Sequence, residues 1–150
     1  MRAFLTAVVQ PFHVKAYSRL KELHPEFKCV LATGYPMKRI SPDFADDLFL
    51  KTFPEATYIS THGLIHPEAI YKLKTHKNWL TSDLLNDLKY LESLFYRLTD
   101  RSNITPIPTA NKRQIYLILL NYYLDLFDRH PFDTVITLNY PHSYFEIFGI

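Results

Sequence analysis

The sequence predicts an α/β domain in which a parallel sheet is layered between helices, and three observations support this class. Short apolar, β-branched segments alternate with amphipathic segments along the chain. Two long amphipathic segments follow in its second half. Hydrophobic residues make up 47% of the sequence, a fraction typical of globular proteins, and 150 residues are the length of one domain. We therefore expect residues 1–150 to form a single α/β domain.

The first part of the chain predicts a βαβ unit. Residues 3–9 and 27–33 are apolar runs typical of strands that are buried on both faces. Between them, residues 14–23 place apolar side chains at helical spacings and end before a proline. A strand, a helix and a strand within about thirty residues imply parallel pairing with a right-handed crossover.

Shorter elements are expected in the middle of the chain. Ser41 and Pro42 are typical of a helix start, so a helix is predicted from there to Lys51. A strand over 57–61 and a short helix over 66–74 follow.

Two long helices are the clearest elements. The predicted helix over 82–101 has one apolar stripe and a capping residue at Thr81 or Ser82. The helix over 110–129, with Thr109 as its cap, has two apolar stripes, so it should pack against both the sheet and the preceding helix. With a fourth strand over 133–139, the order of elements is that of a three-layer, Rossmann-like domain with two long packed helices.

The end of the chain carries a further expectation. A last helix begins near Tyr144, and the sequence stops after about two helical turns. We expect the chain to be the N-terminal domain of a longer two-domain protein. The face of strand 133–139 that this helix leaves open should then self-associate or meet the missing C-terminal domain.

Composition excludes several classes of protein. The formal net charge is +2, so no strong field attracts nucleic acid, and the longest apolar run, Ile115 to Leu120, is far too short to span a membrane. The single cysteine, Cys29, lies in an apolar run and is expected to be a buried hydrophobe. A reducing, cytoplasmic compartment fits one unpaired cysteine.

Common catalytic motifs are absent. With glycine only at positions 34, 63 and 149, neither a dinucleotide-binding nor a Walker phosphate loop can be written, and no Gly-x-Ser-x-Gly elbow occurs. His62 and His66 have metal-ligand spacing, but they fall in a loop with only Glu68 nearby. No metal site is therefore expected.

Two sets of charged residues are interpreted as solvent-facing. Lys72, Lys74, His76 and Lys77 form a short basic cluster at a helix end. The second set lies on the polar face of the last long helix and consists of Gln114, Asn121, Asp125 and Asp128.

The best site candidate is the loop Asn139-Tyr140-Pro141-His142. Ligands of open α/β sheets bind beyond the carboxyl ends of strands, beside the next helix N-terminus, where an anion is also favoured. His142 would there exchange a proton near neutral pH. The alternative is that His142 caps or packs. Asp100 and Arg101, at a helix end, are explained equally by a local ion pair, by a cap or by function.

Three segments carry a resemblance. Residues 88–101 (LKYLESLFYRLTDR) resemble the "yE-s-F-r-l-D-R" helix of bacterial capsular polysaccharide biosynthesis proteins, which are glycosyltransferase-like. The helix with Arg113, Tyr116, Leu120 and Tyr123 is similar to their "R-x-x-Y-x-x-L" helix. Residues 132–142 (FDTVITLNYPH) are similar to their "D-x-v-i-f-x-N-x-P-H" strand and loop. The resemblance covers about residues 80–150.

The resemblance implies a role in surface polysaccharide assembly. It implies His142 as the catalytic base or acceptor orienter, with Arg101 and Arg113 neutralising phosphate or carboxylate. The positions carried over by motif are Glu92, Asp100, Arg101, Arg113, Asn139, Pro141 and His142. The expected partner is a sugar or polysaccharide acceptor.

No cofactor is expected in this domain. A nucleotide-sugar donor would belong to the second domain of the full-length protein, so the isolated chain is expected to be inactive. The alternative function is a non-catalytic α/β module that binds a carbohydrate or a protein.

Overall fold

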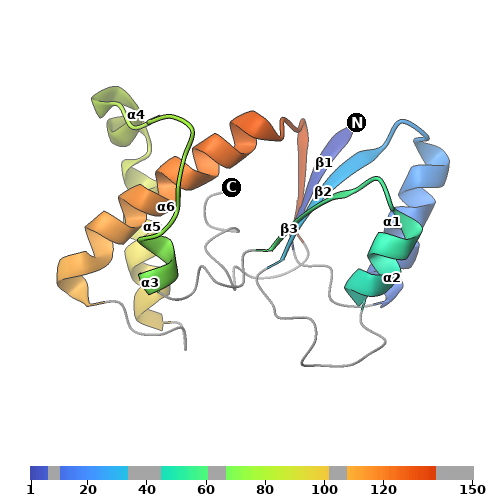
Figure 1. The fold of residues 1–150 in the computed structure, drawn as a ribbon, viewed down its shortest axis with the longest axis horizontal. Helices are drawn as coiled ribbons and strands as arrows, with labels where there is room; N and C mark the ends of the chain where they lie inside the picture. The colour runs from blue at the N-terminus through green and yellow to red at the C-terminus, as the bar shows by residue number, and fades with distance from the viewer. Residues whose placement is uncertain (7–10, 34–44, 61–66, 102–107, 138–150) are drawn as a thin grey trace. The chain divides into compact units, whose positions relative to one another are not determined.

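The computed structural model describes residues 1–6, 11–33, 45–60, 67–101 and 108–137 (Figure 1). They belong to two compact units, one built around a sheet and one built of helices. The chain is therefore a mixed α/β protein, as predicted. The expectation of a single domain stays a prediction.

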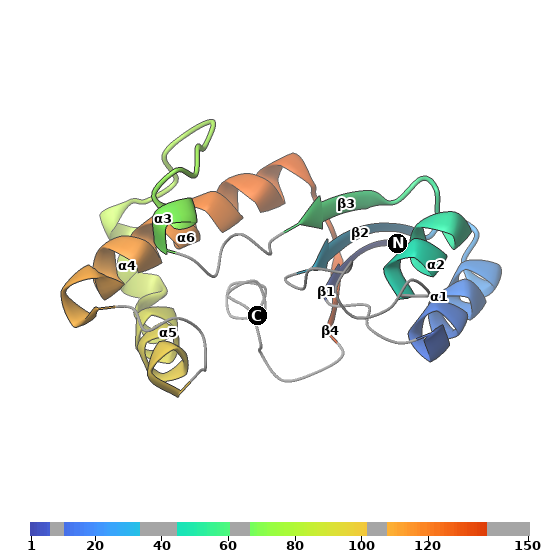
Figure 2. The same cartoon turned by 60° about the horizontal axis from the view of Figure 1, so that its bottom comes forward.

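The sheet unit contains four parallel strands in the order β3-β2-β1-β4 (Figure 2). The strands are β1 Arg2–Thr6, β2 Lys28–Thr33, β3 Thr57–Ser60 and β4 Thr134–Thr137. The predicted parallel pairing is confirmed. The distant β4 joins the edge of β1, so the sheet is completed by residues from the other end of the sequence.

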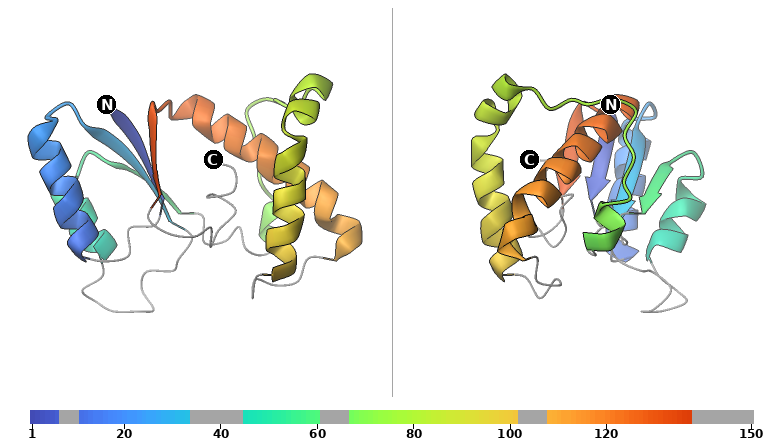
Figure 3. Two further views of the ribbon diagram at one scale, coloured as in Figure 1. Left: turned by 180° about the vertical axis from the view of Figure 1, so that it is seen from behind. Right: turned by 60° about the vertical axis from the view of Figure 1, so that its left-hand side comes forward.

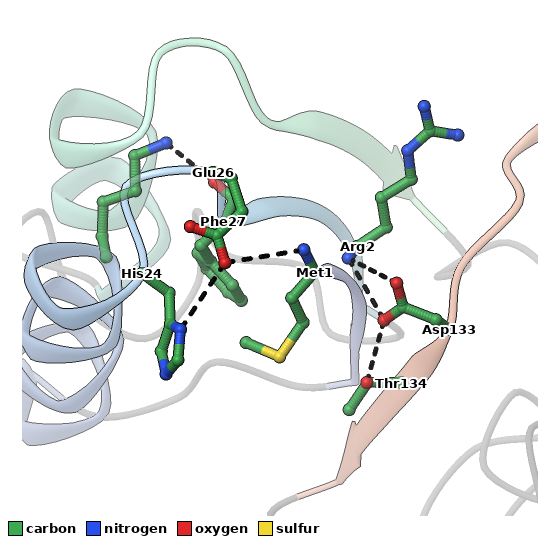
Figure 4. A network of polar contacts seen from close by, with 8 residues as sticks. Met1, Arg2, His24, Glu26, Phe27, Asp133 and Thr134 are labelled. Atoms are coloured by element: carbon green, nitrogen blue, oxygen red, sulfur yellow. Dashed lines mark hydrogen bonds and ion pairs between the residues drawn. The ribbon is translucent and has the colours of Figure 1, made fainter.

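A carboxylate fixes the junction of β1 and β4 (Figure 4). The backbone N–H of Arg2 donates to both carboxylate oxygens of Asp133 at 3.2 Å, and the N–H of Asp133 donates to the Arg2 carbonyl. Thr134 donates its hydroxyl to the same carboxylate at 3.0 Å. These donors, the Arg2 N–H first, hold the pKa of Asp133 below its usual value.

Helices α1 Pro11–Leu23 and α2 Ala45–Thr52 lie side by side on one side of the sheet (Figure 1). They bury an aromatic core whose rings make edge-on and tilted contacts, with 4.9 Å between the Phe49 and Phe53 centroids. The α1 helix begins at Pro11 rather than at residue 14, because proline is favoured in the first helical turn, where its missing N–H costs nothing.

The described residues of the helical unit form four helices, drawn in green to orange in Figure 3. They are α3 Pro67–Ile70, α4 Ser82–Asp87, α5 Lys89–Arg101 and α6 Thr109–Arg129. The predicted packing of the two long helices on each other is confirmed for α5 and α6, where the rings of Phe95 and Tyr116 lie 5.6 Å apart. Among the described helices, none combines the length and apolarity that crossing a membrane requires.

Three local predictions were wrong. The helix expected over 82–101 is divided at Leu88, whose carbonyl accepts from the Leu91 N–H at 2.9 Å and from the Tyr116 hydroxyl at 3.4 Å. The helix expected over 66–74 ends at Ile70, and the N–H groups of Lys72 and Leu73 bond to carbonyls three residues back, as in a turn. Pro108, not Thr109, precedes α6, and no side chain caps that helix. Thr81, by contrast, caps α4 as expected.

Candidate functional site

The site begins with a carboxylate shared between two helices. Glu92 of α5 accepts a hydrogen bond from the Tyr96 hydroxyl at 2.8 Å. The same oxygen lies 3.8 Å from Nε of Arg113 on α6. We call Tyr90, Glu92, Tyr96, Arg113 and Tyr116 the α5–α6 cluster.

Helical spacing explains how this cluster forms. Glu92 and Tyr96 are four residues apart, so they are neighbours on one face of α5. The rings of Phe95 on α5 and Tyr116 on α6 pack against each other. Arg113 lies one turn before Tyr116, so this packing brings it opposite Glu92. The Arg113 side chain stays 74% exposed, so the guanidinium is positioned at one edge while most of it faces water.

Tyr96 and Tyr116 remain protonated at neutral pH. Burial, the hydrogen bond to Glu92 and its negative charge raise the pKa of Tyr96, and Arg113 opposes this only partly. Burial, followed by the charges of Glu92, Tyr90 and Tyr96, raises the pKa of Tyr116 to about 12. The cluster therefore offers neutral hydroxyls, one carboxylate and one guanidinium, which suit binding by hydrogen bonds rather than proton transfer.

Tyr90 adds an exposed aromatic ring near one member of the cluster. It lies in the first turn of α5 and is 58% exposed. Two residues before Glu92, it leaves the helix in a different direction from that carboxylate, and its link to the cluster is through Tyr116, whose pKa it helps to raise. A ring with an apolar face and a polar tip can contact both the C–H and O–H groups of a ligand.

The structure brings together two of the residues that sequence analysis selected, Glu92 and Arg113. Asp100 and Arg101 end α5 in helical conformation, and their side chains lie outside the description. Asn139, Pro141 and His142 lie outside the described residues, so their predicted roles stay predictions.

Sequence analysis missed the tyrosines of the cluster. The signal for Tyr96 was present, because a tyrosine four residues after a glutamate on a helix reaches its carboxylate. Tyr90 and Tyr116 stood in the segments that carry the resemblance, but no role was assigned to them. Their place in the cluster depends on how α5 and α6 cross.

The polar face of α6 was partly misinterpreted. Asp128 and Gln114 are exposed, as predicted, but Asp125 is only 2% exposed and Asn121 is partly buried. The segment between α3 and α4 has irregular backbone whose N–H groups need acceptors, and these two side chains supply them.

Two other candidate chemistries find no support among the described residues. No group of three or more histidine, cysteine, aspartate or glutamate side chains there is arranged to hold a metal ion. Cys29 is buried, as predicted, and burial raises the pKa of its thiol to about 12, with the nearby Glu55 charge adding to the shift. The thiol is therefore protonated and unreactive at neutral pH.

No protein-family model, curated protein or solved structure matches this chain.

Proposed function

We propose that the chain is a glycosyltransferase-like domain of capsular or surface polysaccharide assembly, whose α5–α6 cluster binds the saccharide acceptor. The observation that carries this proposal is the pairing of Glu92 with Arg113. These two residues come from separate helices, and each belongs to a motif that resembles the capsular polysaccharide proteins.

The chemistry of the cluster supports saccharide binding. Sugars present C–H faces to aromatic rings and hydroxyls to planar polar side chains, and Tyr90 and Glu92 provide one of each. The guanidinium of Arg113 matches the geometry of a carboxylate or phosphate on the sugar. Glu92, 3.8 Å from Nε, leaves most of the guanidinium exposed for such a group.

The proposed reaction is transfer of a glycosyl group to an acceptor hydroxyl. The bond from the sugar's anomeric carbon to the leaving nucleotide breaks, and a glycosidic bond to the acceptor oxygen forms. His142 takes the proton of the acceptor hydroxyl as general base. Asn139 and Pro141 shape the loop that presents His142, and Asp100 orients Arg101 toward the anionic part of the ligand.

This role corresponds to a three-layer, Rossmann-like arrangement in a cytoplasmic protein. In such an arrangement the His142 loop follows the carboxyl end of β4, where ligands of open α/β sheets bind. The nucleotide sugar would be held by a further domain of the full-length protein.

The second candidate function is a non-catalytic carbohydrate-binding module. The observation that favours it is that the described cluster consists of hydrogen-bonding groups, among them Tyr96 and Tyr116, whose raised pKa values keep their hydroxyls protonated. In this case His142 caps or packs and takes no part in a reaction.

A binding assay with matched variants tests the proposal. We expect calorimetric titration with a panel of neutral and acidic oligosaccharides to detect at least one ligand. Arg113→Gln and Tyr90→Ala should each weaken that ligand about tenfold, which is the effect of about 1.4 kcal/mol. Arg19→Gln removes a comparable exposed arginine, paired with Glu22 at 2.6 Å in the sheet unit, and should leave binding unchanged. Equal effects of Arg19→Gln and Arg113→Gln, or no ligand in the panel, would overturn the proposal.

A transfer assay separates the two candidate functions. The full-length protein is incubated with nucleotide sugars and the bound oligosaccharide. His142→Ala should abolish transfer and leave the melting temperature and acceptor binding unchanged. Binding without transfer in the wild-type protein identifies the non-catalytic module. A large fall in melting temperature would show that His142 is structural.

A further inference from the structure

The segment that joins α3 to α4 is irregular in conformation and yet firmly attached to α6. We call residues 71–80 the basic loop. Asn121 accepts a hydrogen bond from the backbone N–H of Trp79 at 2.7 Å. Its amide donates to the Thr75 hydroxyl at 2.9 Å and to the Lys77 carbonyl at 3.2 Å.

Asp125 makes the second attachment. Its carboxylate accepts from the backbone N–H of His76 at 3.0 Å and pairs with Nε of Arg129 at 3.1 Å. Hydrogen bonds to a buried, ionised acceptor are stronger than those between neutral groups. The backbone of the basic loop is therefore held at its centre by two side chains that lie one helical turn apart on α6.

The side chains that this backbone presents are cationic. Lys72, Lys74 and Lys77 are exposed, and the imidazole of His76 is exposed among them. Within the part of the chain that the structure describes, no carboxylate forms an ion pair with these lysines, although the sheet unit pairs Lys21 with Glu55 at 3.1 Å. The loop thus concentrates uncompensated positive charge on a fixed backbone.

Aromatic residues lie near both ends of the basic loop. Tyr71 is 42% exposed at the start of the loop. Near its end, the ammonium of Lys77 lies 3.2 Å from the centroid of the Trp79 ring, which restrains this lysine.

We propose that the basic loop is a binding surface for an acidic polysaccharide, which carries carboxylate or phosphate groups at regular intervals. The choice of a glycan as the polyanion rests on the proposed function. The fixed backbone and the uncompensated lysines do not depend on it.

The Trp79 ring disfavours a nucleic acid. One face of this ring is covered by Lys77, and the ring is partly buried, so it is a poor platform for stacking bases.

A binding titration with charge-neutralising variants tests the proposal. The probe is a size-fractionated oligogalacturonate, with neutral dextran and single-stranded oligodeoxythymidine as comparison ligands. We expect Lys72→Gln/Lys74→Gln to weaken oligogalacturonate binding about tenfold, and Lys72→Arg/Lys74→Arg to retain it, because the charge remains. The matched control is Lys15→Gln/Lys28→Gln, which removes two exposed lysines from the sheet unit and should retain binding.

The outcomes are distinguishable from those of the acceptor assay. Binding that falls with the loop variant and not with Arg113→Gln supports the basic loop and overturns the α5–α6 cluster as the acceptor site. Binding that falls only with Arg113→Gln supports the α5–α6 cluster and overturns the basic loop as the binding surface. The loop proposal is also overturned by absence of oligogalacturonate binding, by equal loss in the Lys15/Lys28 control, or by equal affinity for oligodeoxythymidine.

Discussion

The two units of the molecule satisfy their backbone polar groups in different ways. In the sheet unit, parallel strands pair with one another, and the helices beside them bury an aromatic, apolar core. In the helical unit, side chains of α6 satisfy the irregular backbone of the basic loop. Among the described residues, the buried polar or charged side chains are Thr99, Lys112 and Asp125, and all three lie in the helical unit.

This difference shows what an irregular segment requires. A strand brings its own hydrogen-bond partners, whereas a loop against a helix must find acceptors and donors on side chains. The stability of the sheet unit should therefore depend on ring packing, and that of the helical unit on a few buried polar residues. The predictions below test this contrast.

The largest effect is expected from Phe49→Ala in the sheet unit. Phe49 is fully buried and contacts both Tyr17 and Phe53, so its removal leaves a cavity among rings. We expect the free energy of unfolding to fall by about 3–5 kcal/mol, measured by urea denaturation. The neighbouring Leu48→Ala, at a site that is 42% exposed, should change it by less than about 0.5 kcal/mol. Equal effects of the two substitutions would show that the core is not where the structure places it.

In the helical unit the corresponding substitution is Asp125→Ala. It leaves the His76 N–H without its acceptor and Arg129 without its partner, so we expect a loss of about 2 kcal/mol in urea denaturation. Asp128→Ala, one turn away and exposed, is the matched control and should have little effect. Retained stability in Asp125→Ala would contradict the contrast between the units.

Asp125 also predicts how stability depends on pH. Burial by itself would raise the pKa of this carboxyl, but the His76 N–H and the Arg129 charge outweigh it and hold the pKa below the ordinary value of 3.8. Its contribution is therefore present above pH 3.8 and is lost as the pH falls through the lowered pKa. The wild-type protein should lose more stability than Asp125→Ala over that acidic interval, as urea titrations at several pH values would measure. If the stability of the two proteins fell equally with pH, Asp125 would not be the source of this pH dependence.

A smaller and more local effect is expected from Asn121→Ala. The substitution removes the bonds to Thr75, Lys77 and Trp79, and we expect a loss of about 1–1.5 kcal/mol. Hydrogen exchange should show that this loss is local to the basic loop, because the Trp79 amide loses its acceptor and should exchange faster. Amides of β1 and β2 should keep their protection relative to global unfolding. Unchanged exchange at Trp79 would mean that Asn121 does not hold the loop.

The smallest effect on stability is expected from Glu92→Gln in the α5–α6 cluster. The pair with Arg113 is long and exposed, so it is worth about 0.5 kcal/mol or less. The pKa of Tyr96 should nevertheless fall, because Glu92 contributes both a hydrogen bond and a charge that raise it. Titration of ¹³C-labelled tyrosine by NMR would measure this shift. Glu22→Gln, in the sheet unit, should leave the Tyr96 pKa unchanged.

The success of sequence analysis differed between the two units. The parallel sheet could be predicted, because buried strands and the helix between them follow simple periodic patterns along the chain. The position of α6 at 109–129 was predicted for the same reason. The break at Leu88 could not be, because nothing in the stripe of leucines shows that Tyr116 bonds to that carbonyl.

The pairing at the candidate site was not predicted, although both of its residues had been named. Glu92 and Arg113 were selected from motifs, and the structure shows that they pair. The burial of Asp125 could not be predicted, because on a helical wheel it shares the polar face with the exposed Asp128. Only the path of the basic loop over α6 separates the two.

The position of β4 has a consequence for protein synthesis. On the ribosome, β1 emerges early, but its partner on one edge does not exist until residues 63–130 of the helical unit have been translated. At rates of about 5–20 residues per second, the chain from Thr6 to Thr134 takes roughly 6–26 s. During this time, β1 presents unpaired N–H and C=O groups along that edge, the kind of surface on which nascent chains join one another. The ease of producing this protein should therefore depend on how quickly the helical unit is made and closed, as well as on the stability of the finished fold.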